Sequence, residues 1–271
     1  MRSRLIWLSV YAILMSTSVA CSNGAESAAE ATTRIPEGSA QTEPAQVFID
    51  GFRLTFESAD GEIGNDIIEL TSRFTHRLRW SEASHVIQVR RTQSSDIEAL
   101  VPDELMGEVI HHLPLLTQEG GFSIGVMQPE TGPSPNRRRP PGYASVRLFD
   151  TESYVSVRQR ALAEHHQISG AEVFHQDNRS FVRLQLNEAA AARISQFAAS
   201  NGQGQLVLHN QRFAVAIVEF SGSLSGEQLI FEVTGRTNPA LIANLATSGP
   251  MPANLAIVSQ LPFSGIVETR L

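Results

Sequence analysis

Histidine is the residue of this sequence that could most directly support catalysis or metal binding. Four of the eight histidines form two adjacent pairs, His111–His112 and His165–His166. Adjacent side chains point about 100° apart on a helix and to opposite faces on a strand, so neither pair chelates a metal ion alone. A metal enzyme would need at least three of six histidines to converge in the fold: His111, His112, His165, His166, His175 and His209. We therefore predict no metal, no cofactor and no catalytic group, and a histidine-dependent enzyme is the least favoured alternative.

Cys21 is the only cysteine, and it follows a typical export signal. Arg2 and Arg4 precede the short apolar run Leu5–Met15, and Ser18-Val19-Ala20 leads into Cys21. This order predicts a signal peptide over residues 1–20. It also resembles the lipobox of bacterial lipoproteins, with Ser18 where leucine is usual. That resemblance implies that Cys21 is acylated and becomes the mature N-terminus; the alternative is an ordinary cleavage site with an incidental cysteine.

The segment 21–46 would then join the lipid to the folded body. Residues 22–46 consist mainly of Ala, Ser, Thr, Glu and Pro, which offer little to bury and predict a flexible tether. Ser22 stands where lipoproteins retained at the inner membrane carry aspartate, so the resemblance implies the outer membrane. The expected location is the periplasm, with the chain anchored to a membrane by its lipid.

Charge and length limit the classes of partner and the size of the fold. The formal net charge is −7, and removal of residues 1–20 takes away two arginines and no acid, giving −9. An acidic chain argues against nucleic acid as a partner. Residues 47–271 suffice for one large or two small domains. They contain no run of about 18 apolar residues of the kind that spans a bilayer.

The first part of the body, residues 47–128, predicts a ferredoxin-like unit. Residues 52–57 alternate as a strand, and a helix should carry the apolar stripe Ile67, Leu70, Phe74 and Leu78. We expect a second strand over residues 85–91, a helix from residue 95 or 96 to 112, and a third strand over residues 122–127. The resulting β-α-β-α-β order is typical of a ferredoxin-like α+β fold.

A Pro- and Arg-rich linker, residues 129–142, is expected next. It contains Arg137, Arg138 and Arg139, which favour a solvated loop over a contact with anionic lipid or phosphate. The second subdomain, residues 143–250, should contain strands at 144–150, 153–159, 181–186 and several between 203 and 235. Its helices should begin after Asn187 and at Asn238, where an N-cap residue precedes a helix-forming run. A last strand is expected at residues 255–258, within the C-terminal segment 251–271.

From residue 168 onward the sequence resembles the periplasmic P1 domain of SecD, a subunit of the SecDF protein-export complex. The similar text is ISGAEVFHQDNRSFVRLQLNEAAAARISQF, then GQLVLHNQRFAVAIV, then NPALIANLATSGPMPANLAIV. The resemblance implies a mixed-sheet P1 head on a ferredoxin-like P1 base, to which the C-terminal strand could return. It departs from the family at the hairpin Asn210-Gln211, where Asp-Gly is usual. A two-residue type I′ turn needs positive φ at both positions, which Asn tolerates and Gln does not, so either a strained turn of this type or a turn of another type is expected. The transmembrane helices of SecD are absent from this sequence.

The resemblance implies a function in handling polypeptide. Residues 213–218 alternate so that Phe213, Val215 and Ile217 share one side of a strand, and this face either packs in the core or lines a groove for extended polypeptide. We therefore predict a non-catalytic envelope lipoprotein that binds exported polypeptide or an envelope protein, the Sec machinery included. The alternative from another class is a structural subunit of an envelope assembly.

Overall fold

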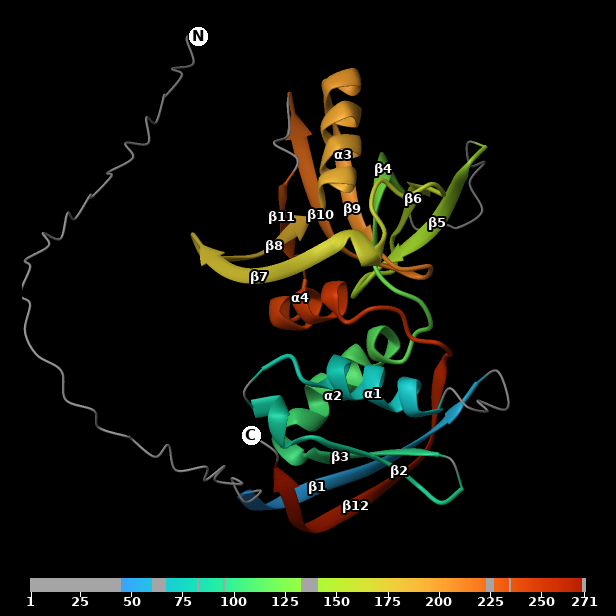
Figure 1. Cartoon of the computed structure of the whole chain (residues 1–271), viewed down its shortest axis with the longest axis vertical. Helices are drawn as coiled ribbons and strands as arrows, with labels where there is room; N and C mark the ends of the chain where they lie inside the picture. The colour runs from blue at the N-terminus through green and yellow to red at the C-terminus, as the bar shows by residue number, and fades with distance from the viewer. Residues whose placement is uncertain are drawn as a thin grey trace, which may run out of the picture. The chain divides into compact units, whose positions relative to one another are not determined.

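A computed structural model describes residues 45–59, 67–81, 83–94, 96–132, 141–222, 227–233 and 235–269. From Glu43 onward the chain forms one compact unit. Two layers of it, here called the base and the head, each contain their own sheet (Figure 1). Among the described residues, no helix has both the length and the apolar character needed to cross a membrane.

The base is a four-stranded antiparallel sheet covered by two helices on one face (Figure 1). Its strand order is β12-β1-β3-β2, and the chain runs β-α-β-β-α before it leaves for the head and returns as the fourth strand. This is the connectivity of a ferredoxin-like unit with the head inserted before its last strand. The elements are β1 (Ala45–Ser58), α1 (Ile67–Leu78), β2 (Gln88–Arg91), β3 (Ile97–Pro102), α2 (Asp103–Leu116) and β12 (Leu255–Thr269), with a short 3-10 turn, η2 (Ala83–Val86), before β2.

Helix α1 forms where its apolar spacing predicts. Ile67, Leu70, Phe74 and Leu78 are all buried, and the ring of Phe74 meets that of Phe56 on β1 at 4.8 Å between centroids. A stripe repeating every three or four residues aligns on one side of a helix, so a single face seals against the sheet. The α+β class expected from the sequence is therefore confirmed.

Two expectations for the base are wrong. Residues 97–102 form strand β3, the central partner of β1 and β2, and the helix begins only at Asp103. Pro102 immediately precedes that helix and has extended backbone (φ −58°, ψ 149°). Its missing N–H costs no helical hydrogen bond at this position. The strand at residues 122–127 exists, but it belongs to β4, which pairs with strands of the head.

The head contains eight strands in the order β5-β6-β4-β9-β10-β11-β8-β7. An additional parallel pairing of β5 with β10 makes the sheet mixed and closes five strands, β5-β6-β4-β9-β10, into a ring. The elements are β4 (Ser123–Gly132), β5 (Tyr143–Leu148), β6 (Tyr154–Arg158), β7 (Ile168–Gln176), β8 (Arg179–Leu186), α3 (Glu188–Asn201), β9 (Gln203–His209), β10 (Phe213–Ser221), β11 (Gln228–Val233) and α4 (Pro239–Thr247), with the 3-10 turn η3 (His165–Gln167) before β7.

The two head helices begin at the residues that the sequence indicates. The side chain of Asn187 accepts a hydrogen bond from the Ala190 N–H, and that of Asn238 accepts one from the Ala240 N–H. Each bond satisfies one of the amide groups that a helix leaves free at its start. Pro239 occupies the first turn of α4, where a missing N–H costs nothing.

The segment expected as a linker starts later than predicted. Residues 129–132 continue strand β4, because pairing with β6 extends to Gly132. Arg137–Arg139 lie outside the described residues, so neither interpretation of them is tested. The C-terminal strand β12 pairs with β1 along its whole length, from Ala45–Thr269 to Ser58–Leu255.

The turn at Asn210-Gln211 is of another type than the two-residue turn of the family. Gln211 is not among the residues with positive φ, so a two-residue turn with two left-handed positions is excluded. Instead, the Asn210 side chain accepts hydrogen bonds from the N–H groups of Arg212 (2.9 Å) and Phe213 (2.7 Å). The left-handed pair occurs at Asp177-Asn178, which joins β7 to β8.

A buried arginine fixes the two chain segments that connect base and head, here called the neck (residues 117–122 and 249–254). Gly120 and Met251 exchange two backbone hydrogen bonds across it. From α1, Arg77 donates to the carbonyls of Gln118 (2.7 Å), Gly120 (2.6 Å) and Gly249 (3.2 Å). Burial lowers the pKa of Arg77 to about 9, which leaves the guanidinium protonated at neutral pH.

Candidate functional site

The three residues expected to share one face of β10 do not do so. A β-bulge between Ala214 and Ala216 sets two residues of β10 against one of β9. The alternation therefore shifts after Val215. Phe213 and Val215 pack with the main core, whereas Ile217 packs with the interior of the five-stranded ring.

Strand β10 is apolar on both sides because each side is covered. One side faces the core beneath α3 and α4, and the other faces the ring interior, where Ala214 lies with Val207. Val215 is 3% exposed. Phe213 and Ile217 are half-buried and pack on different clusters, so the three residues form no common binding face and a groove must be sought elsewhere.

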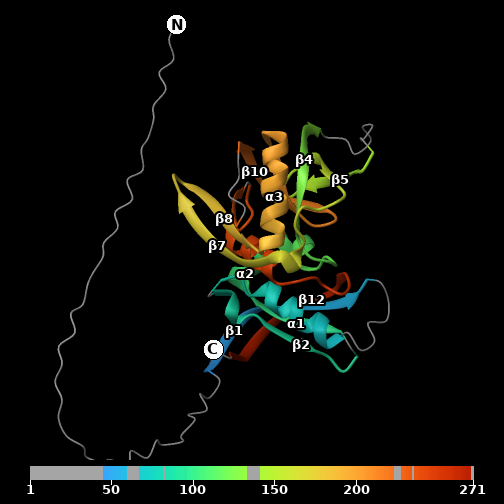
Figure 2. The same cartoon turned by 45° about the horizontal axis from the view of Figure 1, so that its top comes forward.

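Three neighbouring hollows lie along α3. The first, about 600 Å³, and the middle one, about 280 Å³, share Arg160, Ala161 and Arg193 as lining residues. The middle one and the third, about 530 Å³, share Phe197. We call this row of hollows the α3 groove. It lies beside the helix that stands next to β4 in Figure 2.

The end of the groove near the end of α3 is partly apolar. Phe197 of α3 meets Phe220 of β10 at 5.9 Å between ring centroids, and Val126 and Met127 of β4 lie in the same hollow. A Cβ on Gly204 would lie 2.8 Å from the Phe220 ring, so glycine at this position allows the ring to lie against β9. Aromatic rings beside open space offer contact area to an apolar side chain of a ligand.

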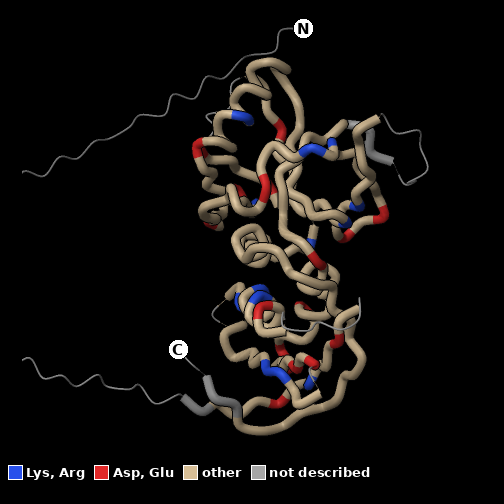
Figure 3. Tube along the Cα trace, turned by 45° about the vertical axis from the view of Figure 1, so that its right-hand side comes forward, with Lys and Arg blue, Asp and Glu red and all other residues tan. Residues whose placement is uncertain are grey.

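The opposite end of the groove is polar and basic. Its lining includes Arg160, His165 and Arg193. Arg193 is held in place because its Nε donates to the Leu162 carbonyl (2.8 Å) and its Nη2 donates to Gln167 Oε1. Figure 3 shows basic and acidic positions scattered over both the base and the head.

Burial favours the uncharged form of two histidines that line the first hollow, His165 and His209. Burial lowers the pKa of His209, whose Nδ1 donates to the Asn210 carbonyl (2.8 Å), and its Nε2 is buried without a hydrogen-bond partner among the described residues. Burial likewise lowers the pKa of His165. Neutral imidazoles add hydrogen-bonding capacity to the groove without adding charge.

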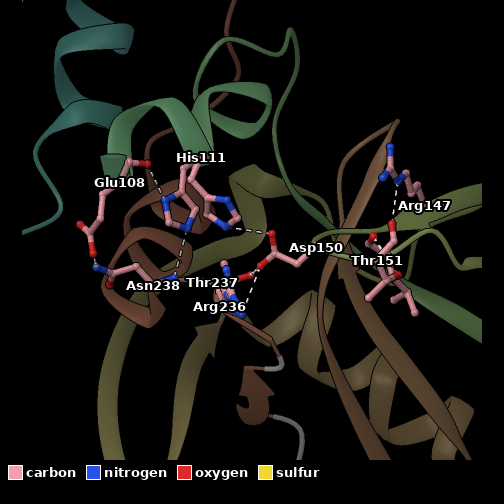
Figure 4. Close-up of polar contacts among 10 residues, drawn as sticks. Glu108, His111, Arg147, Asp150, Thr151, Arg236, Thr237 and Asn238 are labelled. Carbon is pink, nitrogen blue, oxygen red and sulfur yellow. Dashed lines mark hydrogen bonds and ion pairs between the residues drawn. The ribbon is translucent and has the colours of Figure 1, made fainter. Parts of the chain in front are cut away.

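The pair His111–His112 on α2 connects the base to the head (Figure 4). His111 on α2 lies 2.8 Å from the carboxylate of Asp150, which has left-handed backbone (φ 64°) and also accepts from the Arg236 N–H and the Thr237 hydroxyl. His112 is buried; its Nδ1 donates to the Glu108 carbonyl and its Nε2 accepts from the Asn238 N–H.

These histidine contacts satisfy capping and turn groups. Both ring nitrogens of His112 are used by backbone partners, and burial lowers its pKa. Within the described ranges, no three His, Cys, Asp or Glu side chains gather in a way that could hold a metal ion. Cys21 lies outside the described residues, so the structure does not test its acylation.

Sequence reasoning missed the residues of the α3 groove. Phe197 and Arg193 lie beside the buried stripe of α3, which is Ala190, Ile194 and Ala198. A large aromatic residue flanking a stripe of small ones was the available signal. It could not reveal which strand or loop lies opposite.

The fold and the groove together define an α+β protein with a ferredoxin-like base and a mixed-sheet head. Solved structures of SecDF share this fold. One, described as SecDF in a super-membrane-facing form, has a TM-score of 0.55 at 15% identity over 85% of this chain. Another, described as a membrane component SecDF that enhances protein export, has a TM-score of 0.50 at 14% identity over 76% of this chain and 98% of that one.

The resemblance to the SecD P1 domain is thus confirmed at the level of fold. This chain spans 32% of the length of the first SecDF chain. No family model matches the sequence, and no curated protein matches it.

Proposed function

We propose that this protein is a non-catalytic envelope module that binds unfolded or exported polypeptide. The observation that carries the proposal is the α3 groove, whose apolar end contains Phe197 and Phe220. Arg193 and Asn201 are eight residues apart on α3, so the groove along the helix is about 12 Å long at about 1.5 Å per residue. That length matches about four residues of extended chain. Similarity in fold to SecDF supports a role in protein export.

A binding partner that must be released calls for moderate affinity. Shallow apolar contacts tolerate many sequences, and we expect a dissociation constant in the micromolar range, about −8 kcal/mol. The alternative, a structural subunit of an envelope assembly, draws support from a different surface. Phe48 (62% exposed) lies directly opposite Ile266 (63% exposed) on the β1–β12 ribbon.

The test compares two phenylalanines in the chain from Glu43 onward. Phe197→Gln should weaken binding of a reduced, unfolded model protein about tenfold, because loss of one apolar anchor costs about 1.4 kcal/mol. Phe48→Gln removes a phenylalanine that lies outside the groove and should leave the affinity unchanged. Titration calorimetry measures both, and circular dichroism checks that each variant is folded. Binding that is lost with Phe48→Gln but kept with Phe197→Gln would favour the structural-subunit function.

We also propose that Cys21 is acylated and holds the protein at a membrane, with the outer membrane as its address. Each CH₂ buried in lipid contributes about 0.8 kcal/mol, so two or more acyl chains anchor stably. Cys21→Ser should move the protein from the membrane fraction to the soluble fraction of the periplasm. Mass spectrometry of the wild type should show an acylated Cys21 as the first residue. A free thiol, or cleavage at another position, would refute the anchor.

A further inference from the structure

The first hollow of the α3 groove differs in chemistry from the rest of the groove. No large apolar side chain lines it, in contrast to the third hollow with its two phenylalanines and Met127. Gly121 makes room for the polar wall, because a Cβ there would lie 2.8 Å from the His165 ring. The side chains of the lining are mostly charged, imidazole or amide groups, so the hollow suits a polar group.

Positive charge in this hollow is only partly neutralised by its own residues. The Arg160 guanidinium has no partner within the described ranges, and Arg193 has a free Nη1 there because its Nε and Nη2 carry its hydrogen bonds. The one acid of the lining, Glu164, is the N-cap residue of η3, accepts from the Gln167 N–H and lies 3.6 Å from His166. Its single negative charge stands against the two arginines of the lining, which leaves one positive charge in excess.

We propose that the first hollow binds a carboxylate of the polypeptide held in the α3 groove, an inference that rests on the proposed function. Arginine forks match carboxylate oxygens in pairs, and a guanidinium already fixed by other bonds loses little freedom on binding. The carboxylate comes either from an acidic side chain or from the chain terminus.

The test uses three short apolar peptides that differ only in carboxylate content. One ends in a free acid, one in an amide, and one in an amide with a single internal glutamate. We expect one of the two acidic peptides to bind about 5- to 10-fold tighter than the neutral amide, since a charge-assisted bond at a partly open site is of moderate strength. The tighter of the two identifies the source of the carboxylate.

Arg160→Gln should remove that preference, and Arg79→Gln is the matched control. Both arginines are exposed and both variants change the net charge by the same amount, but Arg79 lies on the base, after α1. Loss of the preference in both variants would mean a general charge effect and would overturn the inference. Equal binding of the three peptides by the wild type would also overturn it, while leaving the proposed function intact.

A small probe separates failure of the site from failure of polypeptide binding. N-acetylglutamate at millimolar concentration should shift the NMR signals of the Arg160 or Arg193 Nε–H group, and Arg160→Gln should abolish the shift. If no peptide binds but the probe still shifts these signals, the carboxylate site stands and the proposed function fails. If neither peptide nor probe acts, both are wrong.

Discussion

Replacing Arg77 by leucine should lower the free energy of unfolding by about 3 kcal/mol. The guanidinium is buried and ties α1 to carbonyls of both neck segments, at Gln118, Gly120 and Gly249. Leucine would leave these buried acceptors without their charged donor, and each unsatisfied group costs about 1–3 kcal/mol. The variant also avoids the desolvation penalty of burying a charged guanidinium, which offsets part of this loss in stability. Urea unfolding of the chain from Glu43 onward measures the difference.

Arg79→Leu serves as the control, because Arg79 is exposed two residues away and should change stability by less than about 0.5 kcal/mol. The stability of Arg77→Lys should fall between those of the wild type and Arg77→Leu. An ammonium lacks the planar fork by which the guanidinium reaches carbonyls on both neck segments. Hydrogen exchange at the amides of Gly120 and Met251 should accelerate in Arg77→Leu. A variant as stable as the wild type would show that backbone pairing alone orders the neck.

Phe213→Asp should destabilise the protein by about 3–5 kcal/mol. The Phe213 ring packs on the main core and meets Phe149 edge to face at 5.6 Å, and Phe149 in turn stacks on His112 at 5.8 Å. The change removes a half-buried aromatic ring from this stack and sets a carboxylate against the apolar core. Circular dichroism during thermal unfolding should show the loss before any binding is measured.

The same substitution at Phe48 is the matched control. Phe48 is 62% exposed on β1, so Phe48→Asp should cost less than about 1 kcal/mol through its lost pairing with Ile266. If Phe213→Asp stayed as stable as Phe48→Asp and lost polypeptide binding, the Phe213 face would be a binding surface despite its packing.

Local features of the sequence predicted several elements well. The spacing of Ile67, Leu70, Phe74 and Leu78 predicted α1, and Asn187 and Asn238 predicted where α3 and α4 begin. These signals work because helix periodicity and capping depend on residues within four positions of each other.

Features that depend on distant partners were mispredicted. Residues 97–102 read as the start of a helix, but β1 and β2 offer backbone partners on both sides and make them a strand. The strand at 122–127 was predicted correctly but assigned to the wrong sheet. Its partner β9 lies about 80 residues further along the sequence, so local pattern could not reveal the pairing. The bulge in β10 reversed the side of Ile217, since one extra residue exchanges the two faces of a strand.

The sequence by itself determined the α+β class, the helix starts and the likeness to the SecD P1 domain, because these reside in short-range patterns and in recognisable text. Only the tertiary structure decided that Phe213 and Ile217 pack on different sides of β10 and that Arg160, Arg193 and Phe197 line a groove. A groove exists where elements distant in the sequence fail to fill the space between them, and no single segment contains that information. The same holds for Arg77, because the carbonyls that accept its hydrogen bonds lie at least 39 residues away along the chain.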